Sequence, residues 1–337
     1  MSDLLDRHDF LLADLDGTLY RGAEAVPGAV EAVRGAAARG VRTVFVTNNA
    51  SRRPSDVAAH LAELGFPATE ADVVTSSQAA AAMLADQLPS GAAVLVVGTD
   101  ALAAEVTGVG LTVTTRADDA VAVVQGHSPD TGWRNLAEAT VALRAGAVWV
   151  ACNLDPTLPT ERGPLPGNGS MVTAVRVASA REPQVAGKPG PALVNASVQR
   201  VGARRPLMIG DRLDTDIEGG RVAGMPALLV LTGVSDATEL LAAPPERRPD
   251  YVAADLSCLT HDPDDLAPGP RPGWTVDGGA GHWTLNGAGD PIDALRALCG
   301  AHWTGGGGPA VVGAGDRGAA EALEALGLSD ASATVHS

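Results

Sequence analysis

Lysine is almost missing from this chain of 337 residues. Of its 24 basic side chains only Lys188 is a lysine, and all the others are arginines. Positive charge is scarce as a whole, because 40 Asp and Glu residues give a net charge of −16. A chain this acidic is not expected to bind nucleic acid or a membrane surface, since both are anionic. Any site for an anionic substrate must therefore be locally cationic or use a metal ion.

Cysteines and long apolar runs are also scarce. The three cysteines lie far apart and form no C-x-x-C pair, so they predict neither a disulfide framework nor a zinc site. No apolar run reaches the length of about 20 residues that a bilayer-spanning helix needs. The first ten residues lack the basic-then-apolar pattern of a secretory signal. We therefore expect a cytoplasmic protein without membrane insertion.

Short apolar runs alternate with helical patterns through most of the chain. Residues 10–14 and 41–49 have the pattern of buried strands, and each is followed by a helical pattern that ends at a glycine. This alternation predicts parallel strands joined by right-handed crossovers, with ligands at the carboxyl ends of the strands. Residues 154–170 form a loop rich in Pro and Gly. The loop is long for a compact domain, which favours a functional role.

Acidic residues stand at the ends of two predicted strands. Asp14 and Asp16 end the first strand, and Asp211 and Asp216 follow a later one. An EF-hand calcium loop is excluded for the first pair, because that loop needs its glycine at the sixth position and a glutamate at the twelfth. A solvated turn remains the alternative reading of each acidic pair taken alone.

A polar triplet and the single lysine accompany these acids. Thr47, Asn48 and Asn49 end the second strand before a helix, where a hydroxyl and backbone N–H groups suit an anion. Lys188 stands just before another helical pattern. A helix cap and a surface charge are the plain alternatives. The joint appearance of all these features at strand ends favours catalysis on a phosphate.

Together the motifs resemble the four signature motifs of the haloacid dehalogenase (HAD) superfamily of phosphatases. They read Asp14-x-Asp16-Gly17-Thr18, Thr47, Lys188 and Gly210-Asp211-x-x-x-x-Asp216. The stretches TNN, GKP and GDRLDTDI are similar to those of subclass IIA, the NagD-like phosphatases. The whole chain resembles the actinobacterial glycerol 3-phosphate phosphatases that carry a C-terminal extension. The resemblance to the motifs covers about residues 8–260 and not the tail.

The resemblance implies an α/β fold with three parts. These are a Rossmann-like parallel-sheet HAD core, an inserted α/β cap of the C2 type and a small α+β C-terminal appendage. The expected ranges are 1–80 and 181–260 for the core, 81–180 for the cap and 274–337 for the appendage. Composition predicts a linker over residues 261–273.

The C-terminal appendage faintly resembles a degenerate fragment of an acetyltransferase fold. However, the acyl-CoA signature Arg/Gln-x-x-Gly-x-Gly/Ala is absent from it. Residues 262–337 also hold ten acidic residues against three arginines, which would repel the polyanionic CoA. We therefore expect no acetyl transfer, and a role in dimerisation or in restraining the cap instead.

The resemblance also implies a magnesium-dependent mechanism. Asp14 is the expected nucleophile and forms an aspartyl-phosphate, Asp16 is the general acid and base, and Lys188 stabilises the phosphoryl charge. Magnesium is expected on Asp14, the backbone carbonyl of Asp16 and Asp211, with Asp216 as support. The expected phosphate ligands are Thr47, Asn48 and Asn49.

Substrate specificity is expected to come from the cap, because the core grips only phosphate. Asp155, Glu161 and Arg162 could reach a polar leaving group, although they could equally just solvate their loop. No aromatic residue lies between Trp149 and Tyr251, which disfavours stacking on a ring. A small polyol phosphate is therefore expected, with glycerol 3-phosphate first. Alternatives are 2-phosphoglycolate, pyridoxal phosphate and broad specificity that includes 4-nitrophenyl phosphate.

Other classes of function remain to be weighed. A dehalogenase of the same superfamily needs no acid at Asp16 and is disfavoured, whereas a phosphomutase would use the same four motifs and stays open. A metabolite-binding module on an inactive core would lack the nucleophile, the acid or the cation, but Asp14, Asp16 and Lys188 are all present. The expected partner is a small phosphorylated metabolite, and a homodimer is left open.

Overall fold

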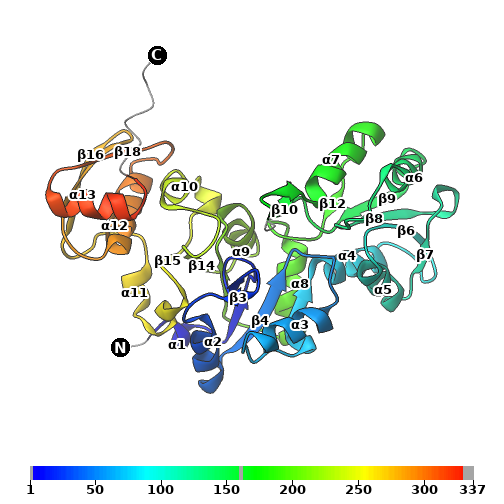
Figure 1. Cartoon of the computed structure of the whole chain (residues 1–337), viewed down its shortest axis with the longest axis horizontal. Coiled ribbons are helices and arrows are strands. Elements are labelled where there is room, and N and C mark those ends of the chain that lie inside the picture. Colours follow the sequence, from blue (N-terminus) through cyan, green and yellow to red (C-terminus); the bar gives the residue numbers. More distant parts are fainter. Residues whose placement is uncertain (1–2, 159–161, 329–337) are drawn as a thin grey trace, which may run out of the picture. The chain divides into compact units, whose positions relative to one another are not determined.

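The structure is a computed structural model that describes residues 3–158 and 162–328. Packing divides the chain into two compact units. Unit 1 comprises Met1–Thr43 and Ala203–Ser337, and unit 2 comprises Val44–Gly202. Both units combine buried strands with helices, which confirms the predicted α/β class (Figure 1). The predicted boundaries of core, cap and appendage stay a prediction.

A parallel sheet forms the centre of unit 1. Unit 1 contributes the strands β15-β14-β13-β1 of a six-stranded sheet, in that order, and each neighbouring pair of these four is parallel. The strands are Phe10–Ala13 (β1), Pro206–Gly210 (β13), Ala227–Val230 (β14) and Tyr251–Ala253 (β15). Ala13 lies opposite Ile209 in this register. Asp14 and Asp211, which follow these two strands, are therefore brought to the same edge of the sheet.

Short helices and one hairpin complete this part of unit 1. The helices are Leu4–Arg7 (α1), Ala29–Ala38 (α2), Glu218–Val222 (α9), Ala237–Leu241 (α10) and Pro263–Leu266 (α11), and the hairpin pairs Tyr20–Arg21 (β2) with Glu24–Ala25 (β3). A π-helical turn, Leu213–Ile217 (η3), follows β13, and 3-10 turns lie at Pro245–Arg247 (η4) and Leu256–Thr260 (η5). Helix α11 lies inside the predicted linker. It forms because the Asp262 side chain accepts the Asp264 amide and Pro263 suits a first helical position.

The last part of unit 1 is a small sheet with two helices. Its elements are Trp274–Gly279 (β16), His282–Gly287 (β17), Pro291–Thr304 (α12), Val311–Ala314 (β18) and Arg317–Ala325 (α13). Strands β16 and β17 are antiparallel, whereas β17 and β18 are parallel. Helix α12 makes the crossover that the parallel pair requires.

Unit 2 begins with two parallel strands and their helices. These elements are Arg42–Thr47 (β4), Pro54–Glu63 (α3), Glu70–Asp72 (η1), Val73–Thr75 (β5), Ser76–Ala85 (α4) and Pro191–Val201 (α8). Thr75 caps α4 in a capping box with Gln78. Strand β4 ends at Thr47, and Asn48 and Asn49 of the predicted polar triplet lie in the loop between β4 and α3.

A second sheet of unit 2 is wholly parallel, with strand order β12-β9-β8-β6-β7. The strands are Ala93–Val97 (β6), Thr112–Thr114 (β7), Ala122–Gln125 (β8), Val148–Ala151 (β9) and Gln184–Val185 (β12). The helical elements are Asp100–Gly108 (α5), Ala117–Asp119 (η2), Trp133–Arg144 (α6) and Asn168–Ser179 (α7). A short hairpin, Thr157–Leu158 (β10) with Leu165–Pro166 (β11), lies before α7.

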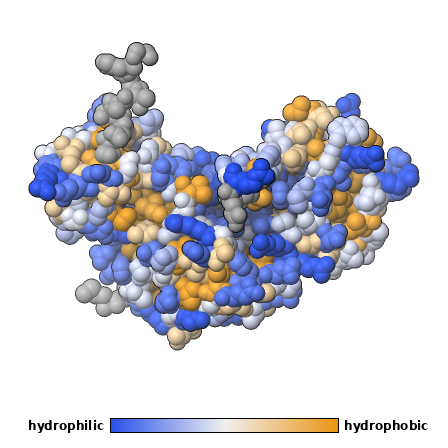
Figure 2. All heavy atoms as spheres, in the orientation of Figure 1, coloured by the Kyte–Doolittle hydropathy of each residue, from blue (hydrophilic) through white to orange (hydrophobic). Residues whose placement is uncertain are grey.

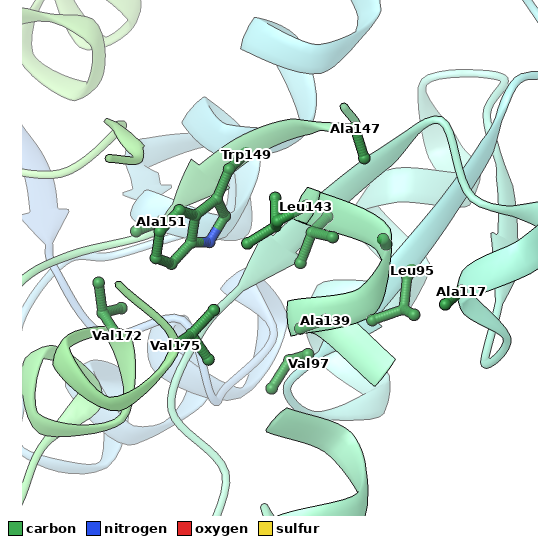
Figure 3. Packing of buried hydrophobic residues seen from close by; sticks show 12 residues of the cluster. Leu95, Val97, Ala117, Ala139, Leu143, Ala147, Trp149, Ala151, Val172 and Val175 are labelled. Carbon is green, nitrogen blue, oxygen red and sulfur yellow. The ribbon is translucent and has the colours of Figure 1, made fainter. Parts of the chain in front are cut away.

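The core of this second sheet is aliphatic around one indole. Trp149 of β9 lies among side chains of β6, β8, α6 and α7 (Figure 3). Leu143 of α6 and Val175 of α7 have no exposed surface. This packing fixes α7, whose first residues adjoin the loop that follows β9.

In the described part of the chain, no helix has the length and apolar character needed to span a membrane. Figure 2 shows hydrophobic and hydrophilic residues interspersed over the face in view.

Candidate active site

Three carboxylates gather in unit 1. One oxygen from each of Asp14, Asp211 and Asp216 lies within 4.8 Å of the others. Asp14 and Asp211 follow β1 and β13, and Asp216 lies in the η3 turn. Asp211 and Asp216 are buried. Three negative charges this close together repel one another strongly unless a cation lies between them.

The Asp211 carboxylate packs closely against two glycines, and any side chain at either position would collide with it. Its Oδ1 accepts a hydrogen bond from the Thr18 hydroxyl at 3.3 Å, and its Oδ2 accepts one from the Val234 amide at 2.7 Å. A Cβ atom on Gly17 would lie 2.4 Å from Oδ2, and one on Gly233 would lie 1.9 Å from it. Neither glycine can therefore carry a side chain without displacing the carboxylate. Gly233 and Val234 escaped the sequence analysis, because nothing in their local pattern signals this contact.

The loop after β14 is tied to the loop after β1. The Thr232 hydroxyl donates to the Gly17 carbonyl at 2.6 Å, and the Arg21 guanidinium donates to the Thr232 carbonyl. The Ser235 amide donates to the Asp211 carbonyl at 3.0 Å. These bonds fix the position of Asp211 through its backbone as well as through its side chain.

The two further aspartates of GDRLDTDI have different surroundings. The Asp216 carboxylate accepts the Arg212 amide at 3.1 Å, and a Cβ on Gly210 would lie 2.2 Å from the Asp216 Cβ. Asp214 instead pairs with the Arg212 guanidinium at 2.9 Å. Although burial acts to raise the pKa of Asp214, the hydrogen bond from Arg212 holds that pKa below its usual value. Asp214 therefore stays outside the three-carboxylate cluster.

The cluster suits magnesium. Mg²⁺ prefers oxygen ligands and is commonly held in proteins by carboxylates together with waters. The predicted ligand set was Asp14, Asp16 and Asp211, with Asp216 in support, and it stays a prediction. The structure groups the Asp216 carboxylate with those of Asp14 and Asp211. Asp16 is exposed and forms an isolated β-bridge with Tyr20.

Lys188 belongs to unit 2 and is almost fully buried, with 2% of its surface exposed. Its Nζ donates to the Val46 carbonyl at 3.3 Å. The Asn48 side chain binds the Lys188 backbone in both directions: Oδ1 accepts its amide at 2.8 Å and Nδ2 donates to its carbonyl at 3.0 Å. Gly187 permits this approach, because a Cβ there would lie 2.6 Å from Asn48 Oδ1. Asn48 therefore positions the lysine.

The other residues of the triplet shape the same loop. The Thr47 hydroxyl accepts the Asn49 amide at 3.0 Å. Asn49 Oδ1 accepts the amide and the hydroxyl of Ser51 at 2.8 and 2.7 Å. The Asn49 side chain therefore stabilises the loop. Phosphate binding by these three residues stays a prediction.

A chain of asparagines connects this loop with α7 of unit 2. Asn153 Nδ2 donates to the Asn48 carbonyl at 2.7 Å, and Asn168 Nδ2 donates to the Asn153 carbonyl at 2.7 Å. Both Asn153 and Asn168 are buried. The sequence analysis missed them, because buried asparagines have no periodic signal. Through these bonds the position of Lys188 depends on the segment that carries the predicted substrate residues.

The predicted substrate residues lie in or near the loop after β9. Asp155 Oδ2 lies 3.4 Å from Asn48 Nδ2, so this carboxylate adjoins the residue that positions Lys188. A Cβ on Gly169 would lie 2.0 Å from the Leu154 carbonyl oxygen, which shows how closely α7 packs on this loop. Arg162 is exposed, and Glu161 lies outside the described residues.

Asn153→Ala is expected to lower kcat by about 10- to 100-fold, because a displacement of Lys188 of the order of 1 Å weakens charge stabilisation. KM should change less than kcat, and the melting temperature should fall by a few degrees, because the Asn48 carbonyl loses the donor that Asn153 supplies. Steady-state kinetics on the full chain measures this. Asn195→Ala, at an exposed position of α8, is the matched control and should leave both constants unchanged. An unchanged kcat in Asn153→Ala would show that the asparagine chain does not position Lys188 for catalysis.

Comparison with known proteins supports the same reading. The profile of the haloacid dehalogenase-like hydrolases matches residues 11–112, and a HAD-hydrolase-like profile matches residues 185–259. A D-glycerol 3-phosphate phosphatase of Mycobacterium tuberculosis is 53% identical over 313 residues, which cover 90% of this chain and 88% of that protein. The chain belongs to the haloacid dehalogenase-like hydrolases. The family predicted from the four motifs is thus confirmed.

Further relatives and solved structures match different shares of the chain. A 5'-nucleotidase of Bacillus subtilis is 40% identical over 226 residues, which cover 66% of this chain and 87% of that protein. Among solved structures, a glycerol phosphate phosphatase from Mycobacterium tuberculosis in complex with magnesium has a TM-score of 0.91 and 52% identity, and covers 97% of this chain and 99% of its own. A 4-nitrophenylphosphatase from Thermotoga maritima has a TM-score of 0.71 and 30% identity, and covers 76% of this chain and 98% of its own.

A third profile, the GCN5-related N-acetyltransferase like domain, matches residues 271–328 of this HAD-like chain. This match agrees with the predicted likeness of the C-terminal residues to an acetyltransferase fragment.

Proposed function

We propose that the chain is a magnesium-dependent phosphomonoester hydrolase that acts on a small polyol phosphate, first of all glycerol 3-phosphate. The observation that carries this proposal is the cluster of Asp14, Asp211 and Asp216, placed at the strand ends of a HAD-like core. The similarity to a D-glycerol 3-phosphate phosphatase over 90% of the chain supports the choice of substrate.

The cluster carboxylates and the Asp16 carbonyl would hold the magnesium ion. When bound, Mg²⁺ neutralises the crowded carboxylates and the charge of the phosphoryl oxygens. Lys188 would supply the second positive charge, held by Asn48 and by the Val46 carbonyl. The Thr47 hydroxyl and the Asn48 backbone amide would bind the phosphoryl oxygens.

The first step would transfer the phosphoryl group to Asp14. A carboxylate oxygen of Asp14 attacks phosphorus, the bond from phosphorus to the ester oxygen breaks, and the carboxyl group of Asp16 gives its proton to the departing alkoxide. The products are a free alcohol and an acyl phosphate on Asp14.

The second step would regenerate the enzyme. Asp16, now a carboxylate, takes a proton from a water molecule as the water oxygen attacks phosphorus. The bond from phosphorus to Asp14 breaks, which releases inorganic phosphate and restores the Asp14 carboxylate. Asp16 holds a proton again at the end and is ready for the next substrate.

Selection of the leaving group is assigned to the loop after β9. The Asp155 carboxylate adjoins Asn48 and would accept hydrogen bonds from the hydroxyls of a polyol. Arg162 is the second candidate for contact with the leaving group. The absence of aromatic residues between Trp149 and Tyr251 disfavours a stacked ring and so favours a polyol over pyridoxal phosphate. We further propose a cytoplasmic location, in keeping with the separated cysteines. Light scattering would measure whether the chain forms a homodimer.

Phosphate release from a panel of phosphomonoesters tests this function, with magnesium and with EDTA. The panel contains both enantiomers of glycerol 3-phosphate, 2-phosphoglycolate, pyridoxal phosphate, a 5'-nucleotide and 4-nitrophenyl phosphate. We expect the highest kcat/KM for glycerol 3-phosphate and loss of release in EDTA, because the cluster needs a cation. Magnesium-dependent release that favours another ester would keep the reaction and change the substrate. No release from any ester would favour the metabolite-binding alternative.

A further inference from the structure

One face of helix α12 lies against the large sheet of unit 1 and its neighbouring loops. The residues that make these contacts are Arg296, Gly300 and Trp303. Their spacing of four and three residues places them on a single side of the helix. In Figure 1, α12 is drawn next to α13, and its contacts reach β15 and α10. The acetyltransferase-like part is therefore joined to the core through a defined helix face.

Arg296 closes the outer edge of the sheet. Strand β15 ends the strand order in the described part of the chain, and an edge strand exposes backbone groups that can pair with another chain. Arg296 Nε and Nη2 donate to the Val252 carbonyl of β15 at 2.8 and 2.6 Å. The Arg296 side chain is buried, and its Nη1 binds Asp293 at 2.7 Å. A buried guanidinium thus takes the place of the next strand at this carbonyl.

The rest of the helix face packs closely on the core. Trp303 Nε1 donates to the Leu241 carbonyl at 3.1 Å, and the Arg248 guanidinium lies over the Trp303 ring at 5.2 Å. A Cβ on Gly300 would lie 2.6 Å from the Gly269 Cα, so the two backbones touch at this point. Together with Arg296, these contacts extend the attachment along about two turns of α12.

One amide of the glycine-rich loop before α12 and one amide of the first turn of α12 donate to nearby carboxylates. Such a loop at a helix N-terminus suits an anion, because its N–H groups point outward. Here the Gly287 amide donates to Asp316 at 2.7 Å and the Ile292 amide donates to Asp290 at 2.9 Å. Hydrogen bonds from the Ala319 and Gly287 amides lower the pKa of Asp316, so this carboxylate stays charged. An anion that approached this loop would meet the carboxylates of Asp290 and Asp316.

We propose that residues 271–328 form an intramolecular clamp whose partner is the β15 edge of this same chain, and that they take no acyl-CoA. The clamp covers the carbonyl edge of β15 and keeps it from pairing with a second chain. A buried arginine binds the strand-edge carbonyl, and an indole binds the Leu241 carbonyl of α10. This proposal is independent of the phosphatase assignment, because it concerns residues outside the carboxylate cluster.

Hydrogen exchange of the full-length chain tests the clamp. Arg296→Met keeps much of the side-chain volume but removes the donors to Val252. We expect the amides of residues 250–254 to exchange about tenfold faster or more, because an unsatisfied buried carbonyl destabilises the strand. Arg317→Met, at an exposed arginine of α13, is the matched control and should leave this exchange unchanged. Unchanged exchange of residues 250–254 in Arg296→Met would overturn the clamp.

The wild-type chain tests the acyl-CoA statement without any variant. Calorimetric titration with acetyl-CoA should give no binding signal at millimolar ligand, because Asp290 and Asp316 occupy the loop. Saturable binding at micromolar acetyl-CoA would overturn this part of the proposal.

Gly300→Val is a second variant that tests the clamp. Its side chain would meet the Gly269 backbone, so the amides of residues 250–254 should lose protection from exchange while the carboxylate cluster still binds magnesium. Retained protection would contradict the close docking of α12.

Discussion

Asp14→Asn will lower kcat for phosphate release by on the order of 10⁴-fold or more, while the chain stays folded. A carboxamide has nearly the shape of a carboxylate but is a very poor nucleophile at phosphorus. Asp14 is only partly buried and ends a short strand, so the fold does not depend on its charge. The substitution also removes one of three crowded charges, and magnesium affinity should fall with it. The measurement is kcat at saturating magnesium, with circular dichroism to follow folding.

Asp214→Asn provides the matched control for Asp14→Asn. Asp214 belongs to the same acidic motif as Asp211, but it pairs with Arg212 and lies outside the cluster. Its loss should change kcat by less than about tenfold, because a partly exposed ion pair contributes little. If Asp14→Asn retained activity similar to that of Asp214→Asn, Asp14 could not be the nucleophile.

Lys188→Arg is expected to lower kcat by about 10²- to 10³-fold although the positive charge is kept. The lysine is 2% exposed, and its Nζ already lies 3.3 Å from the Val46 carbonyl. A planar guanidinium needs more volume and a fixed plane, and in a close-packed site it would move the neighbouring loop. This requirement accounts for a single lysine in a chain that otherwise uses arginine.

The comparison for Lys188→Arg is the opposite exchange at an exposed arginine of the same unit. Arg116→Lys should leave kcat and KM unchanged, because its side chain is 72% exposed and its ion pairs are at the surface. Near-normal kinetics of Lys188→Arg would contradict the argument from shape and would leave the single lysine as a matter of composition.

The strand ends were predictable because local pattern and topology agree there. An apolar run followed by Asp14 predicts a buried strand with an acid at its carboxyl end, and the same reasoning applies to Asp211. Parallel pairing of β1 with β13 then brings both acids to one edge of the sheet. Lys188 could be singled out from the sequence by its rarity and its place before α8, and the structure shows it buried. Its catalytic role stays a prediction.

The supporting residues were not predictable, because their roles depend on contacts between segments far apart in sequence. Asn48 was expected to offer its backbone amide, whereas its side chain binds the backbone of Lys188, 140 positions later. Gly233 looks like an ordinary turn glycine until the Asp211 carboxylate is placed beside it. Sequence alone also cannot show that Asp216 joins the cluster while Asp214 pairs with Arg212. The tail was predicted to serve in dimerisation or in restraining the cap, and its contacts in the described part of the chain include β15 and α10.

Chemical trapping of the intermediate tests the central claim most directly. Borohydride reduces an acyl phosphate on an aspartate to homoserine. The enzyme is therefore quenched with borohydride while it turns over glycerol 3-phosphate in the presence of magnesium, and its peptides are sequenced by mass spectrometry. The account predicts homoserine at position 14 in the wild-type chain and none in Asp14→Asn. Homoserine at another aspartate, or a chain that turns over substrate without any trapped residue, would contradict it.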